Sequence, residues 1–130
     1  MCLSKKLNSA ALQHSQWMRK NKKFIHGSTK DLKTRLTKNK YPLNGAAAEN
    51  IALNSVRSAQ YTVNQWMKSP QHRQSILNRK YNQVNLFRFL LINIQNIFFF
   101  FEIGVGVDET NQKMWWTMLM AKGSDKCIIT

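Results

Sequence analysis

The chain contains few acidic residues, few cysteines and few prolines among its 130 residues. Six Asp and Glu stand against twenty Lys and Arg, which gives a formal net charge of +14. Only Cys2 and Cys127 are present, so a disulfide-dense miniprotein and a CxxC-type zinc module are both excluded. These two cysteines could form one terminal bridge, but nothing in their spacing requires it. The length supports one domain, residues 1–130.

No segment of the sequence has the character of a secretory leader or of a membrane-spanning helix. The first ten residues lack an apolar core, so no signal peptide is visible. The longest apolar stretch, residues 86–101, includes Arg88 and three amide side chains. It is also shorter than the roughly 20 residues that a spanning helix needs. We therefore predict a protein that is not transmembrane.

Positive charge is concentrated in the first 40 residues, which contain eleven Lys and Arg and one acid, Asp31. A field of one sign attracts polyanions such as nucleic acid, acidic glycans or anionic lipid surfaces. The lysines alternate with helix-type apolar positions and no nucleic-acid motif accompanies them, which favours a solvated basic surface. We expect no specific nucleic-acid binding and keep an acidic glycan or an anionic surface as a candidate partner.

Hydrophobic periodicity and capping residues predict helices in the first half of the chain. Apolar residues recur at helical spacing over residues 4–20. Ser28 and Asp31 have the spacing of a capping box at the start of a short second helix. Residues 38–45 are typical of a loop, and residues 58–68 have the apolar stripe of another amphipathic helix.

The second half of the chain predicts one more helix and a hairpin. The Ser-Pro step at residues 69–70 is typical of a helix start, with Ser as N-cap and Pro at the first position. Residues 103–107 and 114–120 have the pattern of two strands joined by a polar turn. Trp115 and Trp116 must then face opposite sides of the sheet, and we expect one of them to be exposed or to line a groove. Helices followed by a hairpin indicate an α+β fold.

Several short motifs follow one another along the chain. In order, they are Leu7…Ala11…His14-Ser15…Met18, Phe24-Ile25-His26, Ala48-Glu49-Asn50-Ile51-Ala52, Trp66-Met67-x-Ser69-Pro70-x-His72-Arg73…Ile76-Leu77, Gly104-Val105-Gly106 and Trp115-Trp116. In this order they resemble the CAP superfamily, the cysteine-rich secretory, antigen 5 and pathogenesis-related 1 proteins. The likeness is greatest to the SCP-type domain of bacteria and fungi. Each motif alone is weak, but their order is specific.

The resemblance implies an α-β-α sandwich with a small antiparallel sheet between helical layers and an open cleft on one side. It also exposes two departures from the family. We expect the family's opening helix, which precedes the one at residues 4–20, to be missing. Residues 84–102 form an atypical insert rich in Phe, Asn, Ile and Leu. A translated intron in the gene model explains it better than a membrane-dipping or ligand-gripping loop does.

The resemblance places His26, Glu49 and His72 in the cleft, where two imidazoles and a carboxylate could hold Zn²⁺. The spacing of these residues does not by itself bring them together. Without the family, Glu49 fits a helix-terminus carboxylate and His26 a surface loop residue equally well. A further glutamate of the family corresponds to Ser69 here, so we expect a weak, incomplete metal site completed by water.

Three neighbours are expected to support the cleft: Asn50, Ser69 as an N-cap, and Arg73 paired with a carboxylate or carbonyl. Glu49 lies in a small apolar run, where a carboxylate needs a donor or a cation. An imidazolium, a metal or Arg73 would serve. His14, on the apolar face of the first helix, is expected to be a hydrogen-bonded core histidine.

The sequence favours a binding protein over an enzyme. It contains no Ser or Cys in a recognisable nucleophile elbow and no Gly-rich phosphate loop. By resemblance we expect a secreted, extracellular, non-enzymatic domain that binds a small lipophile, such as a sterol or fatty acid, or an extracellular protein. The first alternative is a metal-dependent hydrolase using His26, Glu49 and His72. The second is a basic module that binds polyanions.

Overall fold

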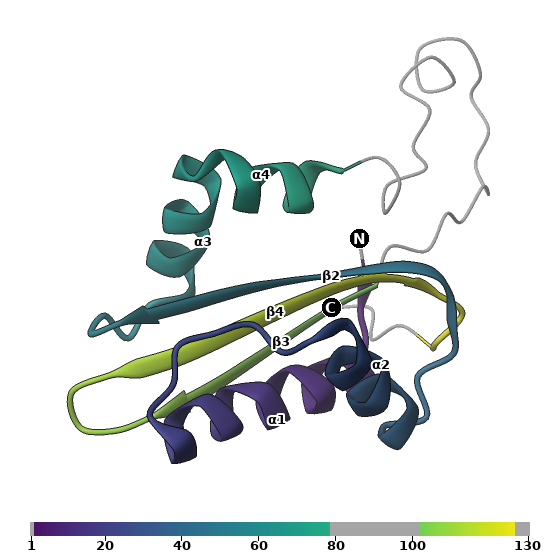
Figure 1. Cartoon of the computed structure of the whole chain (residues 1–130). Helices are drawn as coiled ribbons and strands as arrows, with labels where there is room; N and C mark the ends of the chain where they lie inside the picture. Colours follow the sequence, from purple (N-terminus) through teal and green to yellow (C-terminus); the bar gives the residue numbers. More distant parts are fainter. Residues whose placement is uncertain (1, 79–101, 127–130) are drawn as a thin grey trace, which may run out of the picture.

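The computed structural model describes residues 2–78 and 102–126 of the chain. Within them, two pairs of helices cover the two faces of one sheet (Figure 1). One face carries α1 (Lys5–Asn21) and α2 (Thr29–Lys38), and the other carries α3 (Ala59–Lys68) and α4 (Pro70–Leu77). The predicted α+β class and α-β-α sandwich are thereby confirmed.

The sheet has four strands in the order β1-β3-β4-β2. They are β1 (Cys2–Leu3), β2 (Leu43–Asn54), β3 (Glu102–Glu109) and β4 (Met114–Gly123). The predicted hairpin is β3 and β4, and β2 adds a third antiparallel strand, in line with the small antiparallel sheet that the resemblance implies. The two-residue β1 adds a parallel edge beside β3. The central strand β4 is therefore covered on both faces by helices, and β2 is an outer strand.

Serine caps fix the starts of three helices. Ser4 Oγ accepts from the Leu7 amide at 3.1 Å at the start of α1, and Ser58 Oγ accepts from the Tyr61 amide at 3.1 Å at the start of α3. The capping box predicted for α2 is complete. Ser69 stands at the N-cap of α4 but its side chain makes no capping bond, so only the position of that helix was predicted correctly.

Two glycines of β3 let helix α1 lie directly on the sheet. A Cβ at Gly104 would be 2.1 Å from the Leu7 carbonyl carbon, and one at Gly106 would be 2.1 Å from the Leu12 nitrogen. Ser15 on α1 reinforces this contact, because its hydroxyl donates to the Gly106 carbonyl at 3.0 Å. No larger residue fits at either position without moving the helix.

Successive residues of β4 point to opposite layers. Trp115 and Leu119 pack toward α1 and α2, whereas Trp116, Met118 and Met120 pack toward α3 and α4. The opposite orientation of the two tryptophans is as predicted. Of the two alternatives for one of them, exposure is wrong, and a place in the lining of a groove stays a prediction. Both are 6% exposed, because β4 is central and has helices on both faces.

Strand β2 was not predicted from the sequence. The loop predicted over residues 38–45 ends early, since Leu43 already pairs with Gly123. From Ala47 onward β2 pairs continuously with β4, so Glu49 lies inside a strand and not at a helix terminus. Pairing with an apolar central strand, rather than the local sequence, determines this segment.

Two predictions fall largely on residues that are not described. The insert expected at residues 84–102 lies outside the described residues except for Glu102, which begins β3 and pairs with both Cys2 and Ala121. The boundary of that insert is corrected accordingly. Cys127 also lies outside, so its pairing with Cys2 stays untested. Across residues 2–78 and 102–126, no helix is both long and apolar enough to cross a membrane.

Candidate functional site

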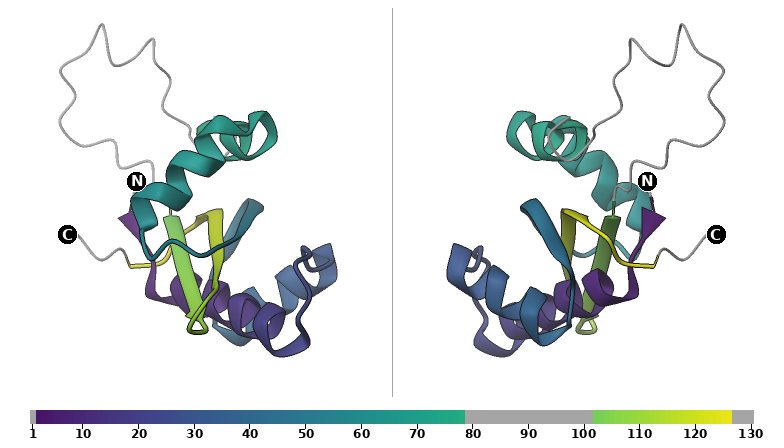
Figure 2. Two further views of the ribbon diagram at one scale, coloured as in Figure 1. Left: turned by 90° about the vertical axis from the view of Figure 1, so that its left-hand side faces the viewer. Right: turned by 90° about the vertical axis from the view of Figure 1, so that its right-hand side faces the viewer.

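The candidate site lies along the outer edge of β2. Helices α2 and α4 flank this edge on opposite faces of the sheet (Figure 2). Neighbouring residues of a strand point to opposite faces, so Glu49 faces the layer of α1 and α2 whereas Asn50 faces α4. Side chains from several elements therefore meet around a single strand edge.

Glu49 is the centre of a buried polar cluster. Its side chain is 7% exposed, and Arg35 of α2 donates from Nη2 to Oε2 at 2.6 Å. The other carboxylate oxygen, Oε1, is 3.1 Å from His26 Nδ1 and 3.5 Å from His14 Nε2. Both oxygens thus have partners supplied by the protein, which removes most of the cost of burying the charge.

The two histidines beside Glu49 differ in their surroundings. The His14 ring is buried and its Nε2 lies 3.1 Å from the Ile25 carbonyl oxygen, so His14 is the hydrogen-bonded core histidine that was expected. Burial lowers the pKa of His14, and the Glu49 charge opposes that shift. The His26 side chain is half exposed, so its ring bridges the buried carboxylate and solvent.

His72 lies on the other side of the β2 edge. Its carbonyl oxygen accepts a hydrogen bond from Asn50 Nδ2 at 3.1 Å, which ties α4 to the strand. Burial lowers the pKa of His72, with a smaller contribution from the charge of His26. The structure therefore brings His26 into contact with Glu49, whereas the described contact of His72 with the strand is made by its backbone carbonyl.

The described side chains, as they lie, do not fit a zinc site. Within residues 2–78 and 102–126, no group of three or more His, Cys, Asp and Glu is placed to hold a metal ion. Arg35 also occupies one oxygen of Glu49, and a bound cation would have to compete with the guanidinium. The zinc site of His26, Glu49 and His72 stays a prediction from the family resemblance.

The three residues expected to support the cleft make different contacts in the structure. Asn50 is 1% exposed and joins β2 to α4, so it holds the two sides of the edge together. The Arg73 side chain is exposed and makes no hydrogen bond or ion pair with any other described residue. It is therefore not the cation that neutralises Glu49. Ser69 contributes its carbonyl to α4, accepting from the Arg73 amide at 2.8 Å.

Sequence reasoning missed Arg35. A signal was present, because Arg35 follows Leu32 by three residues and precedes Leu36 on the inward side of α2. An arginine among inward-facing apolar positions needs a buried acceptor. It finds two, the Glu49 carboxylate and the Ala10 carbonyl at 3.1 Å.

The fold and the site together define a class of protein: a three-layer α-β-α domain that carries imidazoles and a carboxylate at one edge of its sheet. Residues 2–85 match CAP, the cysteine-rich secretory protein family, and the chain belongs to that family. Among solved structures it is similar to an outer surface protein from Borrelia burgdorferi, with a TM-score of 0.65 and 17% sequence identity. The match covers 95% of this chain and 78% of that one, and it shows the fold alone. No curated protein matches the chain.

Proposed function

We propose that the protein is a non-enzymatic CAP domain of the cell exterior or surface that binds a small lipophile such as a sterol or a fatty acid. The observation that carries the non-enzymatic part is the neutralisation of Glu49. A general base needs a free lone pair directed at its substrate. Here Arg35 takes Oε2 and the two imidazoles of His14 and His26 face Oε1.

Hydrolase chemistry has little support among the described residues. In that part of the chain no Ser hydroxyl is hydrogen-bonded to a histidine, so the contact that activates a serine nucleophile is not seen there. A metal-dependent hydrolase using His26, Glu49 and His72 is the alternative. It would require Arg35 to leave the carboxylate and His72 to approach it.

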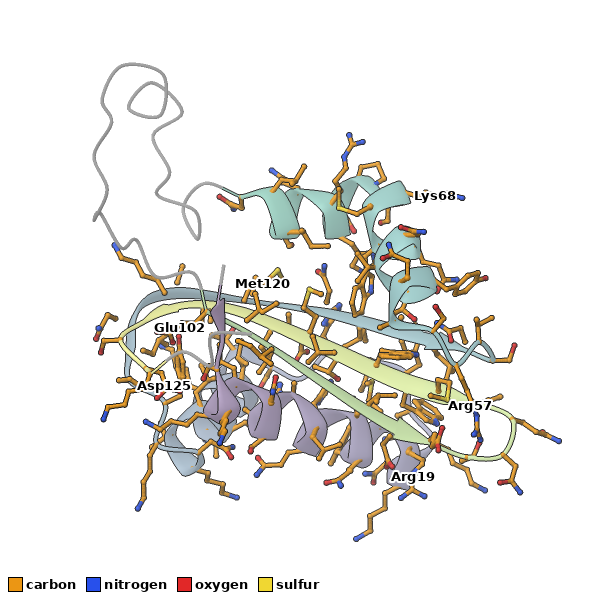
Figure 3. The ribbon with its side chains drawn as sticks, turned by 180° about the vertical axis from the view of Figure 1, so that it is seen from behind. Arg19, Arg57, Lys68, Glu102, Met120 and Asp125 are labelled. Atoms are coloured by element: carbon orange, nitrogen blue, oxygen red, sulfur yellow. The ribbon has the colours of Figure 1, made fainter. Side chains whose placement is uncertain are left out.

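The lipophile is proposed from the sheet face beneath α3 and α4. This face is rich in methionine and aromatic side chains, and Met120 lies on it toward α4 (Figure 3). Methionine adapts its shape to an irregular apolar ligand. Helix α4 contributes little to the cover of this buried face, because it has no buried residue of its own and reaches the cluster through Ile76. A small apolar ligand would extend this cluster beneath α4.

Two adjacent residues of α4 give a matched test. Ile76 packs against the methionine-rich cluster, whereas Leu77 is 54% exposed. We expect the purified chain to bind a fluorescent sterol or a fluorescent fatty acid, and Ile76→Glu to weaken that binding at least about tenfold. Leu77→Glu should bind like the unchanged chain. Equal loss in both variants, or failure of the unchanged chain to bind either probe, would overturn the proposal.

The enzyme alternative and the location have their own tests. Peptide or ester turnover that a chelator and Glu49→Gln both abolish would replace the binding proposal with the hydrolase. An exterior location is supported by the family and by the outer surface protein of similar fold. Labelling of intact cells with a membrane-impermeant reagent checks it. An extracellular protein is the alternative ligand, and a sterol-free chain that captures such a partner would favour it.

A further inference from the structure

Three large apolar side chains are exposed at one corner of the molecule. They are Trp17, Phe24 and Ile25, with 42%, 47% and 50% of their surface exposed. His14 holds two of them together, because its ring stacks on Trp17 with centroids 5.8 Å apart and its Nε2 lies 3.1 Å from the Ile25 carbonyl oxygen. This group, the apolar corner, includes three of the seven large apolar residues found exposed in the described part of the chain.

The shape of the chain at this corner is well defined. Helix α1 ends at Asn21, and Lys22 adopts a left-handed conformation with φ of 52°. Its amide donates to the Arg19 carbonyl, and the Lys23 amide donates to the Met18 carbonyl at 3.0 Å. This closing turn sends Phe24 and Ile25 back along the helix. The backbone hydrogen bonds of this turn therefore fix the position of Phe24 and Ile25 at the surface.

Unpaired positive charge surrounds the apolar corner. Residues 19–30 contain five Lys and Arg and no Asp or Glu. Arg19, which lies at the end of α1 (Figure 3), pairs with Asp108. Lys20, Lys22 and Lys23 are exposed and form no ion pair with any described acid.

We propose that the apolar corner and its three lysines dock on the surface of an anionic lipid bilayer. Aromatic and aliphatic side chains enter the boundary between headgroups and acyl chains, while lysines beside them meet anionic headgroups. A glycan or a nucleic acid would use the lysines but would leave Ile25 without a partner. The surface lies on the layer of α1, so it is separate from the lipophile site proposed beneath α4.

Trp17 provides a direct optical test. The other three tryptophans, Trp66, Trp115 and Trp116, are at most 6% exposed. Vesicles of phosphatidylcholine with phosphatidylserine should shift the emission of the unchanged chain to shorter wavelength, and brominated lipid should quench it. Vesicles of phosphatidylcholine alone should bind more weakly. Trp17→Phe should remove the shift while co-sedimentation with the vesicles persists.

Surface substitutions then separate the contributions. The pair Phe24→Ala and Ile25→Ala should weaken vesicle binding about tenfold or more. Changing Lys20, Lys22 and Lys23 to Gln should weaken it about fivefold for each lysine and remove the preference for phosphatidylserine. Matched controls change equally exposed residues elsewhere and should bind normally: Tyr61→Ala with Leu77→Ala, and Lys68, Arg73 and Lys113 to Gln. Circular dichroism checks that every variant is folded.

The proposal fails if the unchanged chain does not bind phosphatidylserine vesicles, or if the control variants lose binding equally. It also fails if heparin or single-stranded DNA binds through the three lysines while vesicles do not bind, which would make the surface a polyanion site. The lipophile site is tested independently, because Ile76→Glu should leave vesicle binding unchanged.

Discussion

Arg35 Nη2 lies 2.6 Å from Glu49 Oε2 and joins helix α2 to the outer strand of the sheet. The two side chains are 12% and 7% exposed, so the pair is largely withdrawn from water. Loss of Arg35 would leave the buried Glu49 charge with only the two imidazoles facing it, and loss of Glu49 would leave the Arg35 charge with only the Ala10 carbonyl. Such a loss costs far more than loss of a surface pair.

Replacing Arg35 is therefore expected to be costly. Arg35→Ala should lower the free energy of unfolding by about 3 kcal/mol, measured by urea denaturation. Arg57 and Glu109 form an exposed pair at 3.5 Å and serve as the control. Arg57→Ala should change the free energy by less than about 1 kcal/mol. Similar losses in the two variants would show that Arg35 does not stabilise a buried charge.

The close contact of α1 with β3 predicts strong intolerance of side chains at Gly104 and Gly106. Either Gly→Ala change should lower the free energy of unfolding by about 3 kcal/mol or more, because the new Cβ meets helix backbone. At Gly45 the nearest atoms belong to the flexible Lys122 side chain, at 3.3 Å. Gly45→Ala should therefore cost less than about 1 kcal/mol. A tolerated alanine at Gly104 would contradict the described packing.

The pKa of His14 predicts a pH dependence of stability. Burial holds this pKa below the value of 6.5 that the unfolded chain has, so the unfolded state takes up the proton first. Stability should therefore fall as the pH drops through 6.5 toward the folded-state pKa. His14→Gln should show a smaller loss between pH 7 and pH 5 in urea titrations. The charges facing His14, those of Glu49, Arg35 and His26, remain in this variant. Parallel pH profiles would contradict the prediction.

The zinc prediction rests on the family resemblance and is tested by melting temperature. If the side chains rearrange to form the site that the family resemblance implies, zinc should raise the melting temperature of the chain slightly, and the rise should weaken near pH 5 as the histidines take up protons. His26→Ala and His72→Ala should each remove most of the rise. His14→Ala should lower stability and leave the response to zinc unchanged. A melting temperature that does not change with zinc would contradict the prediction of a zinc site here.

The helices could be predicted from the sequence because their signals are local. Serine caps and apolar spacing determine α1, α2 and α3 before any tertiary contact is known. Strand β2 could not be bounded in this way. Its first residues, Leu43-Asn44-Gly45, have little strand propensity, and they become extended through the neighbouring β4 strand.

The sequence predicted that Glu49 needs a cation or hydrogen-bond donors, but it did not predict that Arg35 provides them. The small apolar neighbours of Glu49 indicate a buried carboxylate, and a buried carboxylate requires a cation or donors. That Arg35 fulfils this need depends on how α2 packs against α1 and β2, which sequence spacing does not determine. The expectation of an exposed tryptophan on β4 was wrong for a related reason. The central position of β4 follows from the order of the strands, which the local sequence does not determine.

Because α4 is weakly attached to the sheet, we expect it to be among the first parts of the fold to unfold locally. This helix has no fully buried residue and no side-chain cap, and the Asn50 bond to the His72 carbonyl is one of its few ties to the sheet among residues 2–78 and 102–126. Its amide protons should exchange with deuterium much sooner than those of β4, through a partial opening that leaves the sheet intact. The methionine-rich face could thus be reached from solvent at a rate set by the motion of one short helix, without global unfolding.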